Sequence, residues 1–282
     1  MQIKTFGVVG AGQMGSGIAQ VAAMSGLDVI MNDIEAAFTE RGMGTIDRFL
    51  SKGVEKGKMA PEDKEATLAR ITTSTDLADL SRADFVVEAA VEKEDLKFQI
   101  FQTLDSVCRP EVILSTNTSS IPIGRIAAQT KRPEKVIGMH FMNPVPLMKL
   151  VEVIRGIATS EETFKTTWEL SEKFGKVPAE ANDFPGFIAN RILMPMINEA
   201  IFALYQSVGS REAIDTVMQL GMNHPMGPLA LADLIGLDTC LAIMETLYDG
   251  FKDSKYRPCP LLRKYVEAGW LGRKTGRGFY EY

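Results

Sequence analysis

The segment that most constrains the fold is a glycine-rich turn, Gly10-Ala11-Gly12-Gln13-Met14-Gly15. It follows an apolar run at residues 3–9 that is typical of a buried strand, and it opens a helical pattern at residues 14–25. Glycines at these spacings allow a tight turn, close approach of the backbone to a pyrophosphate, and close packing of helix on strand. Amides at the start of such a helix bind phosphate oxygens. The turn therefore predicts a dinucleotide-binding βαβ unit.

Asp33 indicates which dinucleotide is bound. It comes directly after a second apolar run, at residues 28–32. A carboxylate at this place accepts hydrogen bonds from the adenosine ribose and repels a 2′-phosphate, which favours NAD over NADP. The alternative is a glycine-rich turn with an unrelated surface aspartate, and the strand–turn–helix context disfavours it.

Short apolar runs alternate with helical patterns along the first half of the chain. Further strands are expected at residues 85–89, 112–115, 136–140 and 150–154, and an amphipathic helix around 97–107. This alternation implies crossover connections and predicts an α/β fold of the Rossmann type, with a doubly wound, mostly parallel sheet. Residues 35–70 interrupt the pattern with a polar segment, which we interpret as an inserted helical hairpin.

Strand patterns stop after residue 182. Helices are expected at residues 188–204, 211–220, 228–248 and 260–268, the first of them kinked by Pro195. We therefore divide the chain into an NAD-binding domain, residues 1–183, and an all-α domain, residues 184–282, for substrate binding and dimerisation. Its apolar stripes are wider than so small a domain buries alone, which predicts a homodimer through these helices or a larger homo-oligomer.

Composition and charge disfavour several other classes of protein. Of the 282 residues 45% are hydrophobic and 24% charged, as in soluble globular proteins. A net charge of −5 gives no reason to expect nucleic acid or an anionic membrane, and no apolar run is long enough to span a bilayer. Eight Lys and Arg residues between 252 and 277 form a basic cluster that either solvates a surface or receives phosphates.

The cysteines indicate a compartment. Cys108, Cys240 and Cys259 are few, odd in number and widely spaced. They suggest neither a metal site nor a disulfide framework, and they fit a reducing cytoplasm. The first strand pattern begins within a few residues of Met1, so we expect no signal peptide.

A histidine and a glutamate are candidates for proton transfer. His140 ends the run at residues 136–140, and the carboxyl ends of strands in open α/β sheets bind ligands. Glu152 lies inside the apolar run at residues 150–154, and a buried carboxylate needs a partner. If the turn at Val145 and Pro146 folds one strand beside the other, the two residues can act as base and orienter. From spacing alone, a histidine with a purely structural role is an equally good interpretation.

Polar side chains at two other places can reach the same sheet edge. Asn117, Thr118, Ser119 and Ser120 follow the run at residues 112–115, although Ser120 is also a candidate helix cap. Asn190 is expected one turn into the helix that begins after Gly186. From there its side chain can reach back to the cleft, and an exposed mid-helix asparagine is the alternative.

As an ordered set, these segments resemble the 3-hydroxyacyl-CoA dehydrogenase family along essentially the whole chain. The resemblance is carried by residues 10–15, 87–89, 115–120, 140–144, 149–154, 185–187, 190–191, 224–228 and 272–280. The length, without a fused hydratase, is similar to that of bacterial members that act on 3-hydroxybutyryl-CoA. Met142 departs from the second Phe that is common in the family, which affects packing but no reacting group.

The resemblance implies NAD-dependent interconversion of (S)-3-hydroxybutanoyl-CoA and acetoacetyl-CoA. His140 is then the general base and acid, oriented by Glu152, while Ser119 binds the 3-oxygen and Asn190 the thioester side. Cofactor contacts are implied, besides the glycine turn and Asp33, for Glu92, Lys97, Asn117, Ser119, Asn143 and Lys274. Coenzyme A contacts are implied for Ser51, Lys52 and Lys56 in the helical insertion. His224 and the cysteines are expected to be structural, and no metal is expected.

Two alternatives remain. An NAD-dependent dehydrogenase of a small hydroxy acid would need no distant phosphate contacts, so Lys52 and Lys56 argue against it. A non-catalytic, NAD-binding structural relative would not need the complete set of Ser119, His140, Glu152 and Asn190.

Overall fold

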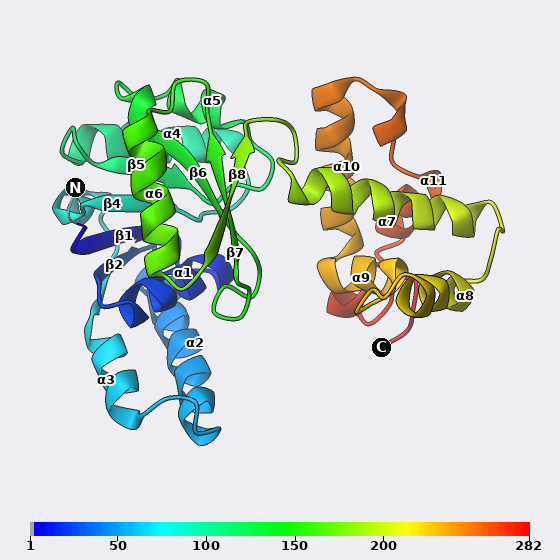
Figure 1. Ribbon diagram of the computed structural model, residues 1–282, viewed down its shortest axis with the longest axis horizontal. Helices are drawn as coiled ribbons and strands as arrows, with labels where there is room; N and C mark the ends of the chain where they lie inside the picture. Colours follow the sequence, from blue (N-terminus) through cyan, green and yellow to red (C-terminus); the bar gives the residue numbers. More distant parts are fainter. Residues whose placement is uncertain (1–2) are drawn as a thin grey trace. The chain divides into compact units, whose positions relative to one another are not determined.

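The computed structural model describes residues 3–282 and divides into two compact units, Met1–Asp183 and Phe184–Tyr282 (Figure 1). The first unit contains one eight-stranded sheet in the order β3-β2-β1-β4-β5-β6-β7-β8. The strands are β1 (Thr5–Val9), β2 (Asp28–Asn32), β3 (Ile71–Ser74), β4 (Phe85–Glu88), β5 (Ile113–Thr116), β6 (Val136–Phe141), β7 (Leu150–Arg155) and β8 (Val177–Asn182). All neighbours pair in parallel except β6 and β7. The predicted Rossmann-type, mostly parallel sheet is thus confirmed.

Four helices accompany the sheet: α1 (Gln13–Met24), α4 (Glu94–Val107), α5 (Ile123–Ala127) and α6 (Glu161–Lys173). The helix α6 was not predicted from the sequence, because its buried face includes Thr163, Thr167 and Ser171 rather than a run of apolar residues. The hydroxyls of Thr167 and Ser171 donate to helix carbonyls one turn earlier, both at 2.8 Å, so they can be buried without cost in hydrogen bonds. The edge strands β3 and β8, which carry few buried apolar residues, were not predicted either.

The inserted helical hairpin is confirmed as α2 (Ala36–Glu55) and α3 (Pro61–Ala69). Pro61 stands in the first turn of α3, followed there by two acidic residues, a helix start that suits both the fixed proline φ and the helix dipole. Lys64 of α3 forms an ion pair with Asp47 of α2 at 2.7 Å. Figure 1 shows the two helices side by side, extending away from the sheet.

The second unit is helical, as predicted, with α7 (Ala189–Tyr205), α8 (Arg211–Thr216), α9 (Pro228–Ile235), α10 (Leu237–Phe251) and α11 (Pro260–Glu267). A π-helical turn, Val217–Gly221, extends α8. The expectation of one helix over residues 228–248 was wrong. Gly236 has a φ of +103°, outside the helical range, and it separates α9 from α10. Within the described residues, no helix is long and apolar enough to cross a membrane.

Two buried aspartates attach the C-terminal segment to these helices. The Asp233 carboxylate accepts hydrogen bonds from the backbone of Phe279 and of Tyr280, both at 2.9 Å. Asp215 accepts one from the Tyr280 hydroxyl at 2.9 Å. Burial raises the pKa of Asp233, although the hydrogen bonds from Phe279 and Tyr280 act in the opposite direction and lower it. The last turn of the chain is therefore part of the packing of the second unit.

Candidate active site

The carboxyl ends of six parallel strands, β1 to β6, meet at one edge of the sheet. β1 and β4 are neighbours there although their connections run in opposite directions, which is the point of a doubly wound sheet where ligands bind. Gly10 and Asp33 follow β1 and β2, Ser119 follows β5, and His140 lies near the end of β6. The fold thus collects most of the candidate residues of the first unit at a single edge.

The glycine turn has the shape that a dinucleotide requires. Gly10 has a φ of +99°, and a Cβ there would lie 2.6 Å from the carbonyl oxygen of Ala89. A Cβ on Gly15 would collide with the carbonyl of Gly10, whereas Gly12 has open space around its Cα. Asp33 accepts a hydrogen bond from the amide of Ala11 at 2.7 Å, which fixes the carboxylate beside the turn. These residues fit the pyrophosphate and ribose of NAD.

His140 and Glu152 lie directly opposite each other on the antiparallel pair β6 and β7. Nδ1 of His140 is 2.8 Å from Oε2 of Glu152, and the two residues are 8% and 1% exposed. The expectation that the hairpin brings the buried carboxylate to the histidine is confirmed. With Nδ1 engaged by the carboxylate, Nε2 is the ring nitrogen that can exchange a proton with a substrate.

The loop between β6 and β7 is held on two sides. The buried Lys176 amine donates to the carbonyl of Met148 at 2.8 Å and to that of Val145, and burial lowers its pKa. On the other side, Nε2 of Gln13 donates to Oδ1 of Asn143 at 3.0 Å and links the glycine turn to the loop. Lys176 was missed by the sequence analysis, because nothing in its neighbourhood marks it as buried.

Asn117 braces neighbouring strands. Its side-chain Oδ1 accepts a hydrogen bond from the backbone amide of Phe141 at 2.8 Å. Its own backbone amide donates to the carbonyl of Glu88 at 2.7 Å. Ser120 is not a helix cap, because its hydroxyl donates to Glu92 at 2.9 Å. The start of α5 is instead capped by Asp183, which accepts hydrogen bonds from the amides of its first two residues.

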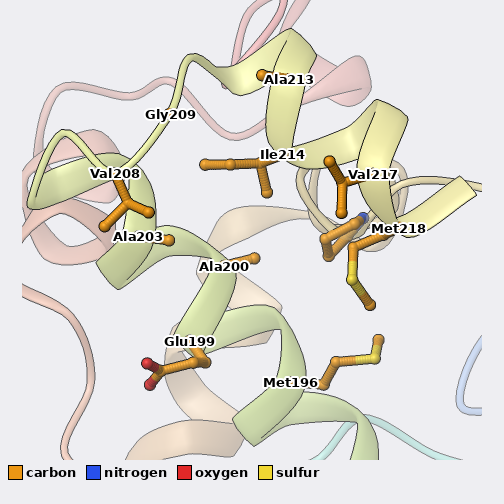
Figure 2. Close-up of a pocket in the computed structure, with 11 residues that line it drawn as sticks. Met196, Glu199, Ala200, Ala203, Val208, Gly209, Ala213, Ile214, Val217 and Met218 are labelled. Atoms are coloured by element: carbon orange, nitrogen blue, oxygen red, sulfur yellow. The ribbon is translucent and has the colours of Figure 1, made fainter. Parts of the chain in front are cut away.

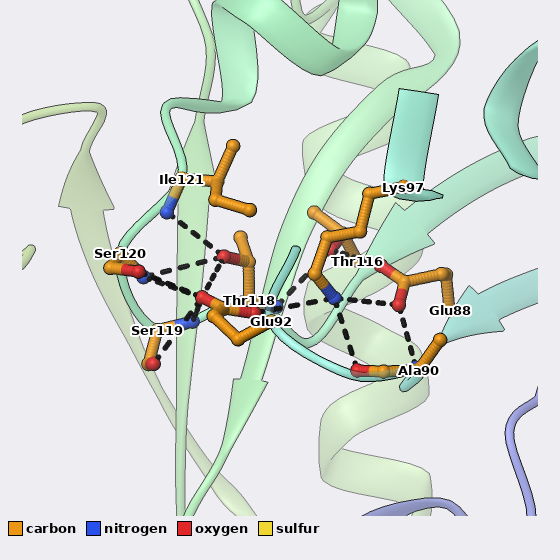
Figure 3. Close-up of polar contacts among 9 residues, drawn as sticks. All are labelled: Glu88, Ala90, Glu92, Lys97, Thr116, Thr118, Ser119, Ser120 and Ile121. Carbon is orange, nitrogen blue, oxygen red and sulfur yellow. Dashed lines mark hydrogen bonds and ion pairs between the residues drawn. The ribbon is translucent and has the colours of Figure 1, made fainter. Parts of the chain in front are cut away.

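A network of charges lies beside Ser119 (Figure 3). Lys97 is 1% exposed, and its amine is 2.6 Å from Glu88 and 3.3 Å from Glu92. The cofactor contact that the resemblance implies for Lys97 stays a prediction beside this buried pairing. Burial opposes ionisation of Glu92, but the Lys97 charge and the hydrogen bonds from residues 118–120 outweigh it and lower its pKa. Glu88 was missed, although a carboxylate in an apolar strand is the same signal that identified Glu152.

The candidates for coenzyme A lie in the helical insertion. Lys52 and Lys56 are exposed at the end of α2, and the Ser51 hydroxyl accepts a hydrogen bond from Lys64 at 2.8 Å.

Two candidates belong to the second unit. Asn190 is buried in the first turn of α7, earlier than expected, and Lys274 pairs with Asp238 at 2.6 Å.

Residues expected to be structural have ordinary surroundings. The three cysteines are buried and free, and burial raises the pKa of Cys108 to about 11 and that of Cys240 to about 12. His224 is half-buried. Much of the basic cluster is paired with acids, as in Arg263 with Glu245 at 2.5 Å. Within residues 3–282, no group of three or more His, Cys, Asp or Glu residues is arranged to hold a metal ion.

Comparison with known proteins agrees with this geometry. The family model for the NAD binding domain of 3-hydroxyacyl-CoA dehydrogenase matches residues 5–184, and that for its C-terminal domain matches residues 186–282. A probable 3-hydroxybutyryl-CoA dehydrogenase of Bacillus subtilis is 59% identical over 282 residues, covering 100% of this chain and 98% of the relative. A 3-hydroxybutyryl-CoA dehydrogenase of Bradyrhizobium diazoefficiens is 59% identical over 280 residues, covering 99% of this chain and 96% of the relative.

A solved structure is also very similar. The crystal structure of (S)-3-hydroxybutyryl-CoA dehydrogenase from Ralstonia eutropha has a TM-score of 0.98 and 52% identity, covering 100% of this chain and 99% of that one. Sequence, fold and relatives agree over both units, and the chain therefore belongs to the NAD-binding 3-hydroxyacyl-CoA dehydrogenase family.

Proposed function

We propose that this dehydrogenase interconverts (S)-3-hydroxybutanoyl-CoA and acetoacetyl-CoA with NAD(H). The observation that carries the proposal is the His140–Glu152 pair, at 2.8 Å, on the sheet edge that also bears the glycine turn. The choice of a four-carbon acyl group is supported by relatives 59% identical to this chain that are named 3-hydroxybutyryl-CoA dehydrogenases.

The proposed chemistry uses both nitrogens of His140. In oxidation Nε2 accepts the proton of the 3-hydroxyl group as the C3–O bond becomes a carbonyl, and in reduction it returns that proton. The glycine turn and Asp33 would hold NAD, which would supply the acceptor for the hydride from C3 in oxidation and, as NADH, its donor in reduction. Glu152 keeps the ring oriented through Nδ1 and stabilises the imidazolium. Ser119 donates a hydrogen bond to the 3-oxygen, and Asn190 binds the thioester side.

The two units divide these tasks in our proposal. The first, residues 1–183, binds NAD through the glycine turn and Asp33, with Glu92 and Asn143 nearby, and the second, residues 184–282, adds Lys274 and binds substrate. Asn117 and Lys97 position their neighbours. Lys52 and Lys56, one turn apart at the end of α2, supply exposed ammonium groups for the phosphates of coenzyme A, beside Ser51. The few, unpaired cysteines support a cytoplasmic location.

A comparison of substrates tests the proposal. Purified protein is expected to oxidise NADH with acetoacetyl-CoA, and to do so much faster than with free acetoacetate, because the free acid lacks the coenzyme A contacts. NADPH is expected to be a poor substitute, since Asp33 repels its 2′-phosphate. Absorbance at the NADH band follows all three reactions. Equal rates with acetoacetate would favour a dehydrogenase of small hydroxy acids, and no reaction with any acyl-CoA would favour a structural relative.

We also propose a homodimer through the second unit. An apolar cavity of about 490 Å³ is lined among others by Met196 and Ala200 of α7 and by Ile214 of α8. Figure 2 shows these side chains around it. A second cavity of about 720 Å³ is lined by Ile192, Leu193 and Leu231 of the same unit. Leu220 is 84% exposed, on the same π-helical turn that supplies Val217 and Met218 to the first cavity. In a self-complementary interface, exposed apolar side chains of each copy would fill the cavities of the other. Such an interface would remove both the cavities and the exposed leucine from water.

Replacement of Leu220 by glutamate is expected to shift the protein from dimer to monomer, because it puts a charge into the apolar interface. Leu220 is so exposed that folding of the monomer should be unaffected. Ile157→Glu is the matched control, since Ile157 is 99% exposed on the first unit. Sedimentation equilibrium measures the mass of each. A monomeric wild-type protein, or a dimer that survives Leu220→Glu, would contradict the proposed interface.

A further inference from the structure

The turn that carries Ser119 is organised by one oxygen atom of Glu92 (Figure 3). Oε1 accepts hydrogen bonds from the amides of Ser119 at 3.0 Å and Ser120 at 3.1 Å. It also accepts from the hydroxyls of Thr118 at 2.5 Å and Ser120 at 2.9 Å. Glu92 lies in the connection between β4 and α4, so these contacts tie that connection to the turn after β5.

The other oxygen of Glu92 is anchored from the interior. Oε2 is 3.3 Å from the buried amine of Lys97, which is 2.6 Å from Oε1 of Glu88. Glu88 is fully buried at the end of β4, and it accepts hydrogen bonds from the Thr116 hydroxyl at 2.7 Å and from the amide of Ala90 at 2.6 Å. The position of Glu92 is thereby fixed to the ends of two central strands.

We propose that Glu92 is a positioning residue for Ser119, holding the 118–120 turn in the conformation that presents the Ser119 hydroxyl to the substrate's 3-oxygen, with Lys97 and Glu88 holding Glu92 in place. The inference rests on the proposed function, which gives Ser119 its role. It assigns to Glu92 a task distinct from the cofactor contact implied by resemblance.

A carboxylate suits this task for two reasons. An ionised carboxylate only accepts, so one oxygen can serve several converging donors, and such charge-assisted hydrogen bonds are stronger than neutral ones. The Ser119 hydroxyl itself is 3.4 Å from Oε1, longer than a normal hydrogen bond between oxygens. The turn is therefore held by Glu92 mainly through its backbone amides and the hydroxyls of Thr118 and Ser120.

Glutamine at position 92 would disturb both sides of the arrangement. An amide has one acceptor oxygen, and if this oxygen serves the turn, its NH₂ group faces the buried Lys97 amine, where two donors meet. If the amide is reversed, the amides of residues 119 and 120 lose their acceptor. In either case the turn relaxes, and a displacement of about 1 Å at a reacting group can cost roughly 10²-fold in rate.

A double-mutant cycle tests the inference. We expect Ser119→Ala and Glu92→Gln each to lower kcat for acetoacetyl-CoA reduction by ~10–10²-fold, and the double variant to be no slower than Ser119→Ala, because both changes remove one function. For Glu92→Gln the loss in kcat is expected to exceed any weakening of the Kd for NADH, measured by fluorescence. Glu94→Gln is the matched control, since Glu94 lies two residues further on, at the start of α4, but pairs with Arg125 at 2.9 Å.

Three results would overturn the inference. Multiplicative losses in the double variant would mean that Glu92 acts independently of Ser119. A loss that lies entirely in the Kd for NADH would make Glu92 a cofactor ligand instead. Full activity of Ser119→Ala would remove the role of Ser119, and with it both this inference and that part of the proposed function. If Glu92→Gln does not fold, Thr118→Val replaces it in the cycle, because it removes the 2.5 Å hydrogen bond and keeps the carboxylate.

Discussion

A His140→Gln variant is expected to lose at least about 10²–10⁴-fold in kcat, the usual contribution of a general acid–base. Glutamine fills a similar volume and can still hydrogen-bond Glu152, but its amide neither takes up nor releases a proton near neutral pH. Initial rates of NADH oxidation with saturating acetoacetyl-CoA measure the effect. We expect the Kd for NADH to change little, because the glycine turn and Asp33 are untouched.

The variant also separates chemistry from folding. Its circular dichroism and its thermal unfolding should resemble those of the wild-type protein. Position 140 lies near the end of β6, and the glutamine amide can still donate a hydrogen bond to the buried Glu152 carboxylate. Ordinary turnover by a correctly folded His140→Gln protein would eliminate His140 as the base.

An Asp233→Ala variant is expected to lower the free energy of unfolding by roughly 2–6 kcal/mol. Asp233 is 1% exposed and accepts the backbone hydrogen bonds of Phe279 and Tyr280. Alanine would leave both amides without an acceptor in a site that excludes water, and each orphaned group costs about 1–3 kcal/mol. The effect is expected in the second unit, whose last turn loses its attachment. Urea unfolding followed by fluorescence measures it.

Asp249→Ala is the control for that experiment. Asp249 is exposed on α10 and pairs with Lys252 three residues later, a contact expected to contribute well under about 1 kcal/mol. An Asp233→Ala protein as stable as this control would show that water or neighbouring groups replace the lost carboxylate, and the C-terminal attachment would then contribute little to stability.

Residue patterns predicted the fold where local and tertiary preferences agree. The apolar run at residues 28–32 matches β2 at both ends, because this central strand is buried on both faces. Predictions failed where buried residues are polar or where a strand is largely exposed, because the apolar pattern then no longer marks the element. The helix α6 buries hydroxyls that bond to their own backbone, and the edge strand β8 needs few apolar residues because much of it is exposed. Gly236 divides a helix that hydrophobic periodicity alone would continue.

The candidate site divides in the same way. Glycine spacing and Asp33 predicted the NAD site, since a tight turn between strand and helix is a local property of the chain. Lys97 could not be placed from sequence. Whether a lysine in the first turn of an amphipathic helix faces solvent or a buried carboxylate depends on the strand packed behind it, and here that strand brings Glu88 to 2.6 Å.

The sequence by itself determined the dinucleotide turn and most of the strands and helices around it, because each depends on neighbours close along the chain. Tertiary structure alone decided which groups meet. The antiparallel register of β6 and β7 brings His140 to Glu152, twelve positions away, and the parallel order of β4 and β5 brings Glu92 to the Ser119 turn. Such contacts are set by strand pairing and burial, which act between segments far apart in sequence.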